Sequence, residues 1–165
     1  MVNKLTPEQQ QSNRLEATRF YVGKGLSPHQ AAGWVGNEMV ESGMDPDIYQ
    51  IGFKSVTDPI SGPGGYGLCQ WTHPARKRAL RDYSVRGGKL VGDLMTQLEF
   101  SWAEINSQGF AGALRALQRT TTAEEAAIAI CEKYEMPGVS HLKRRIEWAQ
   151  VALREYEEFM QGPPQ

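Results

Sequence analysis

A single stretch rich in Gly and Pro, residues 48–71, interrupts a sequence that otherwise shows helical patterns along most of its length. Upstream of it, an N-capping Ser followed by Pro28 opens a helix whose apolar residues recur at helical spacing. Gly43 and Pro46 end this helix, because Gly favours the left-handed C-cap and the residue before Pro avoids the helical region. The sequence therefore predicts a helical fold with one irregular insertion, and it places Glu41 in the last helical turn before that insertion.

Most of the remaining sequence carries signals for the start and the spacing of helices. Thr6 and Thr122 are each followed three positions later by Gln or Glu, which is the capping-box pattern. Apolar residues four positions apart form a stripe that we expect in the core: Leu90, Leu94, Leu98 and Trp102. The predicted helices cover residues 6–23, 27–41, 74–83, 90–105, 110–117, 123–135 and 140–160.

The insertion itself favours a small β-hairpin. Two short extended pieces, residues 49–53 and 66–71, flank a Gly- and Pro-rich turn at residues 61–65. No repeat, low-complexity block or linker divides the 165 residues, and this length suits one domain with a sizeable core. We therefore predict a single domain, residues 1–165, that is mainly α with a small hairpin forming one wall of a groove.

Charge and hydropathy exclude several classes of partner. Lys and Arg number 18 and Asp and Glu number 19, and this net charge of −1 provides no general attraction to nucleic acid and no polybasic membrane patch. No segment approaches the roughly 20 apolar residues of a membrane span, and the N-terminal residues lack the apolar run of a secretory signal. We therefore expect neither a nucleic-acid partner nor a membrane partner.

The cysteines and histidines indicate neither a disulfide nor a metal site. Cys69 and Cys131 are expected to be free thiols, which fits synthesis in a reducing compartment. Neither His73 nor His141 has a Cys or a carboxylate at metal-ligand spacing, so we expect no metal and no cofactor.

Glu41 is the candidate for acid chemistry. It lies where a helix ends and a cleft can open, and the helix C-terminus disfavours a negative charge there. A carboxyl group held away from bulk water keeps its proton near neutral pH and can donate it to a leaving oxygen, as glycosidic bond cleavage requires. Glu38, one turn earlier, is expected to be structural or solvent-facing. The competing interpretation of Glu41 is a solvated side chain at a helix end.

The segment Gly-Tyr-Gly-Leu-Cys-Gln-Trp, residues 65–71, combines features that suit a sugar-binding wall. Its glycines let the backbone approach a ligand, and Tyr66 and Trp71 offer flat apolar faces. Gln70 offers an amide that donates and accepts hydrogen bonds, as sugar hydroxyl and N-acetyl groups require. The alternative is a Gly-rich hairpin whose aromatic side chains belong to the core.

These motifs, taken in order, resemble the phage tail lysozyme family, which comprises virion-associated peptidoglycan hydrolases of the lysozyme superfamily. The Glu-Ser and Gly-Leu-x-Gln elements are also similar to goose-type lysozymes and soluble lytic transglycosylases. The resemblance covers residues 25–149. It is carried by Ala-Gly-x-x-Gly-Asn at residues 32–37, Glu-Ser-Gly at 41–43, Gly-Tyr-Gly-Leu-Cys-Gln-Trp-Thr at 65–72, Gln-Leu-x-Phe at 97–100 with Glu104, Tyr-Glu-x-Pro-Gly at 134–138, and Arg144, Arg145 and Ala149.

The resemblance implies a lysozyme-like α+β domain that cleaves the β-1,4 bond between N-acetylmuramic acid and N-acetylglucosamine of peptidoglycan. It places Glu41 at the position of the general acid. It also places Gln70 at the position of the Gln that lines the sugar groove. Tyr134 and Glu135 match an aromatic-acidic pair near the far wall of that groove.

A second carboxylate is expected, because glycosidases usually use two. Lysozyme-type folds often place one in the hairpin, which makes Asp58 the first choice. Weaker choices are Asp45, Asp47 and Glu135. Two positions after Gln70, where goose-type lysozymes carry an acidic residue, this sequence has Thr72, whose hydroxyl can hold a water but cannot act as a base. This leaves open hydrolysis by an oriented water or a lytic route in which the 6-hydroxyl of the sugar attacks.

Three other functions compete with glycan cleavage. The first is a catalytically silent structural protein of a phage tail, and the second is a carbohydrate-binding module. The third is a Cys-His endopeptidase that uses Cys69 and His73 to cleave the peptide stems of peptidoglycan. As a bacteriolytic enzyme it would act from the virion, next to other phage tail proteins, or from the host cytoplasm as an endolysin before lysis. Glu41 and Gln70 together favour the enzyme.

Overall fold

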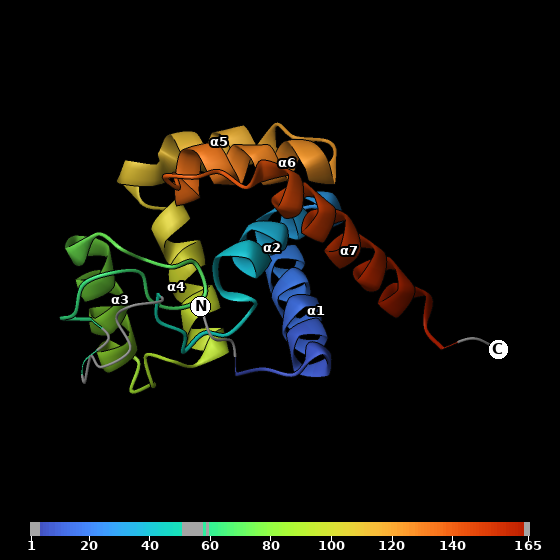
Figure 1. Cartoon of the computed structure of the whole chain (residues 1–165). Coiled ribbons are helices and arrows are strands. Elements are labelled where there is room, and N and C mark those ends of the chain that lie inside the picture. Colours follow the sequence, from blue (N-terminus) through green and yellow to red (C-terminus); the bar gives the residue numbers. More distant parts are fainter. Residues whose placement is uncertain (1–3, 51–57, 59, 164–165) are drawn as a thin grey trace.

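The structure, a computed structural model, describes residues 4–50, 58 and 60–163, and this part of the chain is mainly helical (Figure 1). The helices that hold the core and the groove are α1 (Pro7–Gly23), α2 (Pro28–Ser42), α3 (Pro74–Arg86), α4 (Leu94–Ile105), α5 (Ala111–Gln118), α6 (Ala123–Ile130) and α7 (Leu142–Gln161). A 3-10 turn, Gln108–Phe110, precedes α5, and a π-helical turn, Cys131–Glu135, follows α6. Among the described helices, none has both the length and the apolar character needed to cross a membrane.

The predicted helix starts at Thr6, Ser27 and Thr122 are confirmed. Each of these side chains accepts a hydrogen bond from the backbone N–H three residues later, and each capping box is complete. Other boundaries differ from the prediction. α4 begins at Leu94, because Asp93 accepts from the N–H of Thr96 and caps the helix there. Leu90 is consequently outside the helix and 80% exposed, so its assignment to the core stripe was wrong.

The predicted β-hairpin is not confirmed. Within the described residues, the insertion contains two isolated antiparallel bridges, Tyr49 with Tyr66 and Tyr66 with Trp71, and no longer strand. Most of the first predicted strand lies outside the described residues. Tyr66 and Trp71 exchange two backbone hydrogen bonds of 3.0 Å across a tight turn, so this segment is a looped wall instead of a ribbon.

α2 is the most enclosed helix, because α1, α6 and α7 pack around it (Figure 1). Two glycines make this approach possible. A Cβ atom on Gly33 would lie 2.3 Å from the Cβ of Ala126 in α6, and one on Gly36 would lie 2.4 Å from the carbonyl oxygen of Arg145 in α7. The Gly-x-x-Gly pattern of the sequence therefore brings α6 and α7 into backbone contact with the helix that carries Glu41.

The variant Gly36→Ala is expected to destabilise the protein by about 1–3 kcal/mol, as overpacking in a core commonly does. The added Cβ meets backbone atoms of α7, which cannot rotate away as a side chain would. Denaturant unfolding measures the change. The matched control is Gly112→Ala in α5, where a Cβ has nothing within 4 Å and helix propensity favours Ala. Equal stability of the two variants would contradict close packing at Gly36.

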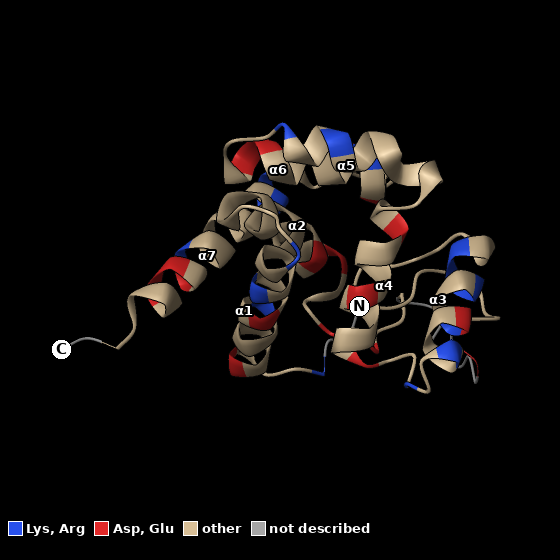
Figure 2. Cartoon of the chain, turned by 180° about the vertical axis from the view of Figure 1, so that it is seen from behind, with Lys and Arg blue, Asp and Glu red and all other residues tan. Residues whose placement is uncertain are grey.

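On the other side of the molecule, α3 packs against the insertion and binds it. Lys and Arg gather on α3 (Figure 2). Two of them bind the insertion. The ammonium group of the buried Lys77 donates to the carbonyl oxygens of Gly62 and Gly64, and the Arg81 guanidinium pairs with Asp58. Part of the basic strip on α3 therefore anchors the wall of the groove.

Candidate active site

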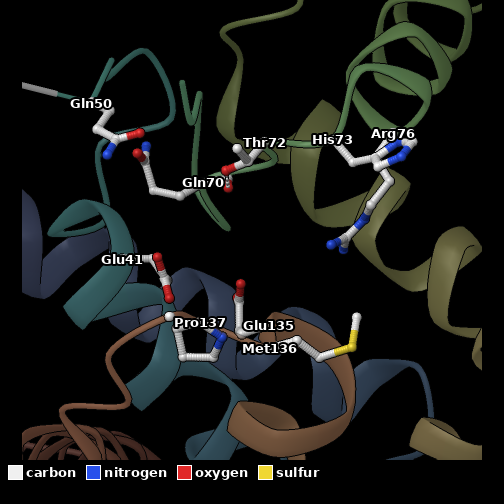
Figure 3. A pocket seen from close by; sticks show the side chains of 10 residues that line it. Glu41, Gln50, Gln70, Thr72, His73, Arg76, Glu135, Met136 and Pro137 are labelled. Atoms are coloured by element: carbon white, nitrogen blue, oxygen red, sulfur yellow. Dashed lines mark hydrogen bonds between the residues drawn. The ribbon is translucent and has the colours of Figure 1, made fainter. Parts of the chain in front are cut away.

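A cavity of about 670 Å³ separates the end of α2 and the turn after α6 from the insertion and the start of α3. This volume lies in the usual range of ligand sites. Figure 3 shows two carboxyl groups on one side of the cavity and amide and hydroxyl groups on the other. The lining residues are Glu41, Gln50, Gln70, Thr72, His73, Arg76, Glu135, Met136, Pro137 and Gly138.

Glu41 stands at the floor of this cavity, in the last turn of α2. The helix stops there because Gly43 and Met44 both adopt left-handed conformations, with φ of 61° and 65°. The sequence placed Glu41 correctly but did not indicate its partner. Arg145 of α7, which is 1% exposed, donates to the Glu41 Oε1 atom at 2.8 Å and to the Oδ1 atom of Asn37 at 3.0 Å. A buried guanidinium therefore fixes the direction in which the Glu41 carboxyl points.

Gln70 and Thr72 form the facing wall. Gln70 adopts a left-handed backbone conformation with φ of 51°. Its amide nitrogen donates to the carbonyl oxygens of Gly67 at 3.0 Å and Ile48 at 3.3 Å, so the side chain is held by its own loop. The Thr72 hydroxyl donates to the carbonyl oxygen of Gln70 at 2.9 Å. These bonds orient the wall before a ligand arrives.

The rings of Tyr66 and Trp71 do not face the cavity. Both side chains are 0% exposed, so the expectation that they stack on a sugar does not hold in this structure. The Tyr66 hydroxyl donates to Asp47 at 2.9 Å, and the Trp71 indole N–H donates to Glu104 at 3.1 Å. The two rings belong to the core, as the alternative interpretation had it, and they support the loop from behind.

Tyr134 is also buried, and it belongs to a cluster around Glu104 that joins both sides of the groove. The Glu104 Oε1 atom accepts hydrogen bonds from the Tyr134 hydroxyl at 2.7 Å and from the Trp71 indole. Arg76 donates to both carboxylate oxygens, at 2.9 and 2.7 Å. Glu104 therefore connects the insertion, α3 and the turn after α6, and it holds Arg76 at the edge of the cavity.

Glu135 lies beside Glu41 on the cavity floor (Figure 3). Its Oε1 atom is buried and has no hydrogen-bond partner in the described part of the chain. Burial raises the pKa of Glu135 well above its ordinary value, and the negative charge of Glu41 raises it further. The residue is therefore a candidate for a carboxyl group that stays neutral near neutral pH.

Asp58, the first choice for the second carboxylate, is not brought to Glu41. It does not line the cavity; it pairs with Arg81 of α3 and accepts hydrogen bonds from Ser61 and the N–H of Ile60. The Arg81 contact lowers the pKa of Asp58 far below its usual range. Among the weaker choices, Asp45 and Asp47 also lie outside the cavity lining. Asp45 shapes a turn by accepting a hydrogen bond from the N–H of Asp47.

The structure does not pair Cys69 with His73. The Cys69 thiol is buried and donates to Glu38 at 3.5 Å, and burial raises its pKa well above the ordinary value. His73 instead caps α3 by accepting from the N–H of Ala75 through Nδ1. Among the described residues, no group of three or more His, Cys, Asp or Glu side chains is arranged to hold a metal ion.

Comparison with known proteins adds one finding to this geometry. No curated protein matches the sequence. The sequence pattern of the family described as phage tail lysozyme matches residues 12–156, which is most of the chain and includes the whole cavity lining. The helical architecture, with a groove between two parts of the fold, is consistent with a lysozyme-like domain. This protein therefore belongs to the phage tail lysozyme family.

Proposed function

We propose that the protein cleaves the β-1,4 glycosidic bond between N-acetylmuramic acid and N-acetylglucosamine of peptidoglycan, with Glu41 as the general acid. Membership in the family indicates a lysozyme-like enzyme that acts on peptidoglycan. The observation that supports the finer assignment is the position of Glu41 at the floor of the cavity, opposite Gln70 and Thr72. We also propose that the protein works from the phage virion, in contact with other tail proteins.

The chemistry follows from this placement. Glu41 donates its proton to the glycosidic oxygen, the bond from C1 to that oxygen breaks, and its electron pair stays with the leaving sugar. Positive charge develops on C1 and the ring oxygen, facing the carboxyl groups of the floor. The C1 atom then bonds to the oxygen of a water or of the 6-hydroxyl of the same sugar. That oxygen releases its proton to Glu41, which restores the acid.

The two outcomes of the second step give different products, and mass spectrometry of digested peptidoglycan separates them. Purified glycan strands are incubated with the protein, and the muropeptides are analysed. Hydrolysis gives reducing ends, and the lytic route gives 1,6-anhydro ends that are lighter by one water. Strands that bind but stay intact would identify a carbohydrate-binding module. Strands that neither bind nor break would identify a structural tail protein.

A further inference from the structure

We propose that Glu135 is the second carboxyl group of this site and that it holds one proton jointly with Glu41 on the cavity floor. The inference rests on the proposed role of Glu41 in glycan cleavage. It replaces Asp58, which lies outside the cavity, with a residue that lines it.

The turn after α6 aims Glu135 into the cavity. Residues Cys131–Glu135 form one π-helical turn, closed by a hydrogen bond of 2.8 Å from the N–H of Met136 to the carbonyl oxygen of Cys131. Met136 then reverses the chain in a left-handed conformation, with φ of 48°. The preceding Tyr134 points the other way and is tied to Glu104 at 2.7 Å. Glu135 is therefore held at the cavity by an anchored neighbour and a defined turn, which are features of a built site.

The surroundings of the two carboxyl groups differ. Glu41 accepts from Arg145 at 2.8 Å, and this contact supports a negative charge. Glu135 has a buried Oε1 atom without a donor. An ionised carboxylate in that position would have no hydrogen-bond donor at its buried oxygen, whereas a carboxyl group that carries a proton reduces this cost. When the charge of one carboxyl group opposes the ionisation of its neighbour, the two protons are lost in two separate steps. The pKa values of these steps belong to the pair and not to either residue.

Charged and titratable groups approach Glu135 from every element around the floor. Two cations, Arg76 of α3 and Arg145 of α7, favour its ionised form. Burial and the charges of Glu41 and Glu38 oppose them and raise the pKa of Glu135. The other titratable side chains that share this environment are Cys69, His73, Cys131 and Tyr134. Neither cation is hydrogen-bonded to Glu135 in the described structure: Arg76 is bound to Glu104 and Arg145 to Glu41.

The pair has a direct consequence for the reaction. Before catalysis it carries one proton and one negative charge, so an acid is present at a pH where an isolated Glu would be ionised. When the proton moves to the glycosidic oxygen, both carboxyl groups are negative and both face the ring that becomes positive. The second oxygen nucleophile, water or the 6-hydroxyl, returns a proton to the pair.

The test is the pH dependence of kcat/KM for Glu135→Gln on peptidoglycan. Without Glu135 the site has no carboxyl pair to hold a shared proton, so the acid is lost at lower pH. The alkaline limb of the profile is therefore expected to move down by at least about one pH unit, while the rate on the acidic side stays within about tenfold of the native rate. The control is Glu132→Gln, an exposed carboxyl group on the same turn, whose profile should match that of the native enzyme.

Two results would overturn the inference: a Glu135→Gln profile with an unmoved alkaline limb, or a loss of the same factor at every pH. Either result with an active native enzyme leaves the proposed function standing. An inactive native enzyme would instead refute the proposed function.

The shared proton also has a readout that needs no activity. The infrared band of a protonated carboxyl group is recorded at neutral pH in the Glu38→Gln variant. This variant removes the signal of the buried Glu38, so a remaining band reports the proton of the Glu41–Glu135 pair. That band should disappear when Glu135→Gln is added, and its persistence would refute the inference.

Discussion

Replacing Glu41 by Gln is expected to slow the cleavage of peptidoglycan by about 10²–10⁴-fold, which is the usual contribution of a general acid. The Gln side chain has no proton of comparable acidity to give to the glycosidic oxygen. It retains an oxygen that can accept from Arg145, so α7 keeps its contact with α2. The loss is measured as the release of reducing or 1,6-anhydro ends from purified glycan strands.

Two controls make this result specific. The thermal midpoint of Glu41→Gln is measured first and the assay is run well below it, because the buried Arg145 keeps Asn37 and Ser140 but loses its charged partner. Glu132→Gln removes an equal charge from the exposed surface and should keep full activity. If Glu41→Gln retained more than about a tenth of the native rate, Glu41 would not be the acid.

The stability of the protein is expected to fall as pH rises, and replacing Glu38 by Gln is expected to remove much of this fall. Glu38 is 0% exposed and accepts from the Tyr21 hydroxyl at 2.7 Å and from the Cys69 thiol at 3.5 Å, while its Oε1 atom has no partner in the described structure. Burial raises the pKa of Glu38 from 4.5 to about 8. The side chain is therefore structural and not solvent-facing, as one of the two sequence interpretations proposed.

The sign of the effect follows from proton counting. Between the two pKa values, 4.5 and about 8, the folded protein holds a proton that the unfolded chain has lost. The free energy of unfolding therefore falls by up to about 1.4 kcal/mol for each pH unit in this window. Above the folded pKa, the contribution of Glu38 to the free energy of unfolding no longer changes with pH. Below the unfolded pKa, the protonated Glu38 contributes its full stabilisation.

Denaturant unfolding at a series of pH values from acidic to alkaline measures this slope. Glu38→Gln is expected to lose some stability at acidic pH, because the new amide N–H groups lack acceptors. Its curve should nonetheless fall less steeply than that of the native protein. Glu135 contributes a slope of the same sign in both proteins, so a slope remains in the variant, and the difference between the curves reports Glu38 together with its charge effect on Glu135. Parallel curves would show that Glu38 ionises normally in the folded state.

The parts of the fold that depend on local chemistry could be predicted from the sequence. The starts of α1, α2 and α6 are determined within a few residues by a capping hydroxyl and its partner three positions later. The end of α2, and with it the position of Glu41, follows from Gly43 in the same local way. Asp93 is also a capping residue, but the apolar spacing through Leu90 concealed it, and the helix was predicted to begin too early.

The parts of the site that depend on tertiary packing could not be predicted. Tyr66 and Trp71 have the composition of a sugar platform, and only tertiary contacts determine that they point inward: Tyr66 bonds to Asp47 and Trp71 to Glu104 of α4. Arg145 is more than 100 residues from Glu41, and no local pattern links the two. The Gly-x-x-Gly motif of α2 was the available signal, since small residues on a buried helix mark the close approach of another backbone.

The contact of Gly36 with α7 also bears on when the Glu41 side chain becomes oriented during synthesis of the chain. Arg145 contributes both its carbonyl oxygen to that contact and its guanidinium to Glu41. During translation, Glu41 leaves the ribosome long before Arg145 does. A nascent chain therefore has Glu41 but lacks the guanidinium that orients it, and this contact forms only when α7 has been synthesised and has packed against α2.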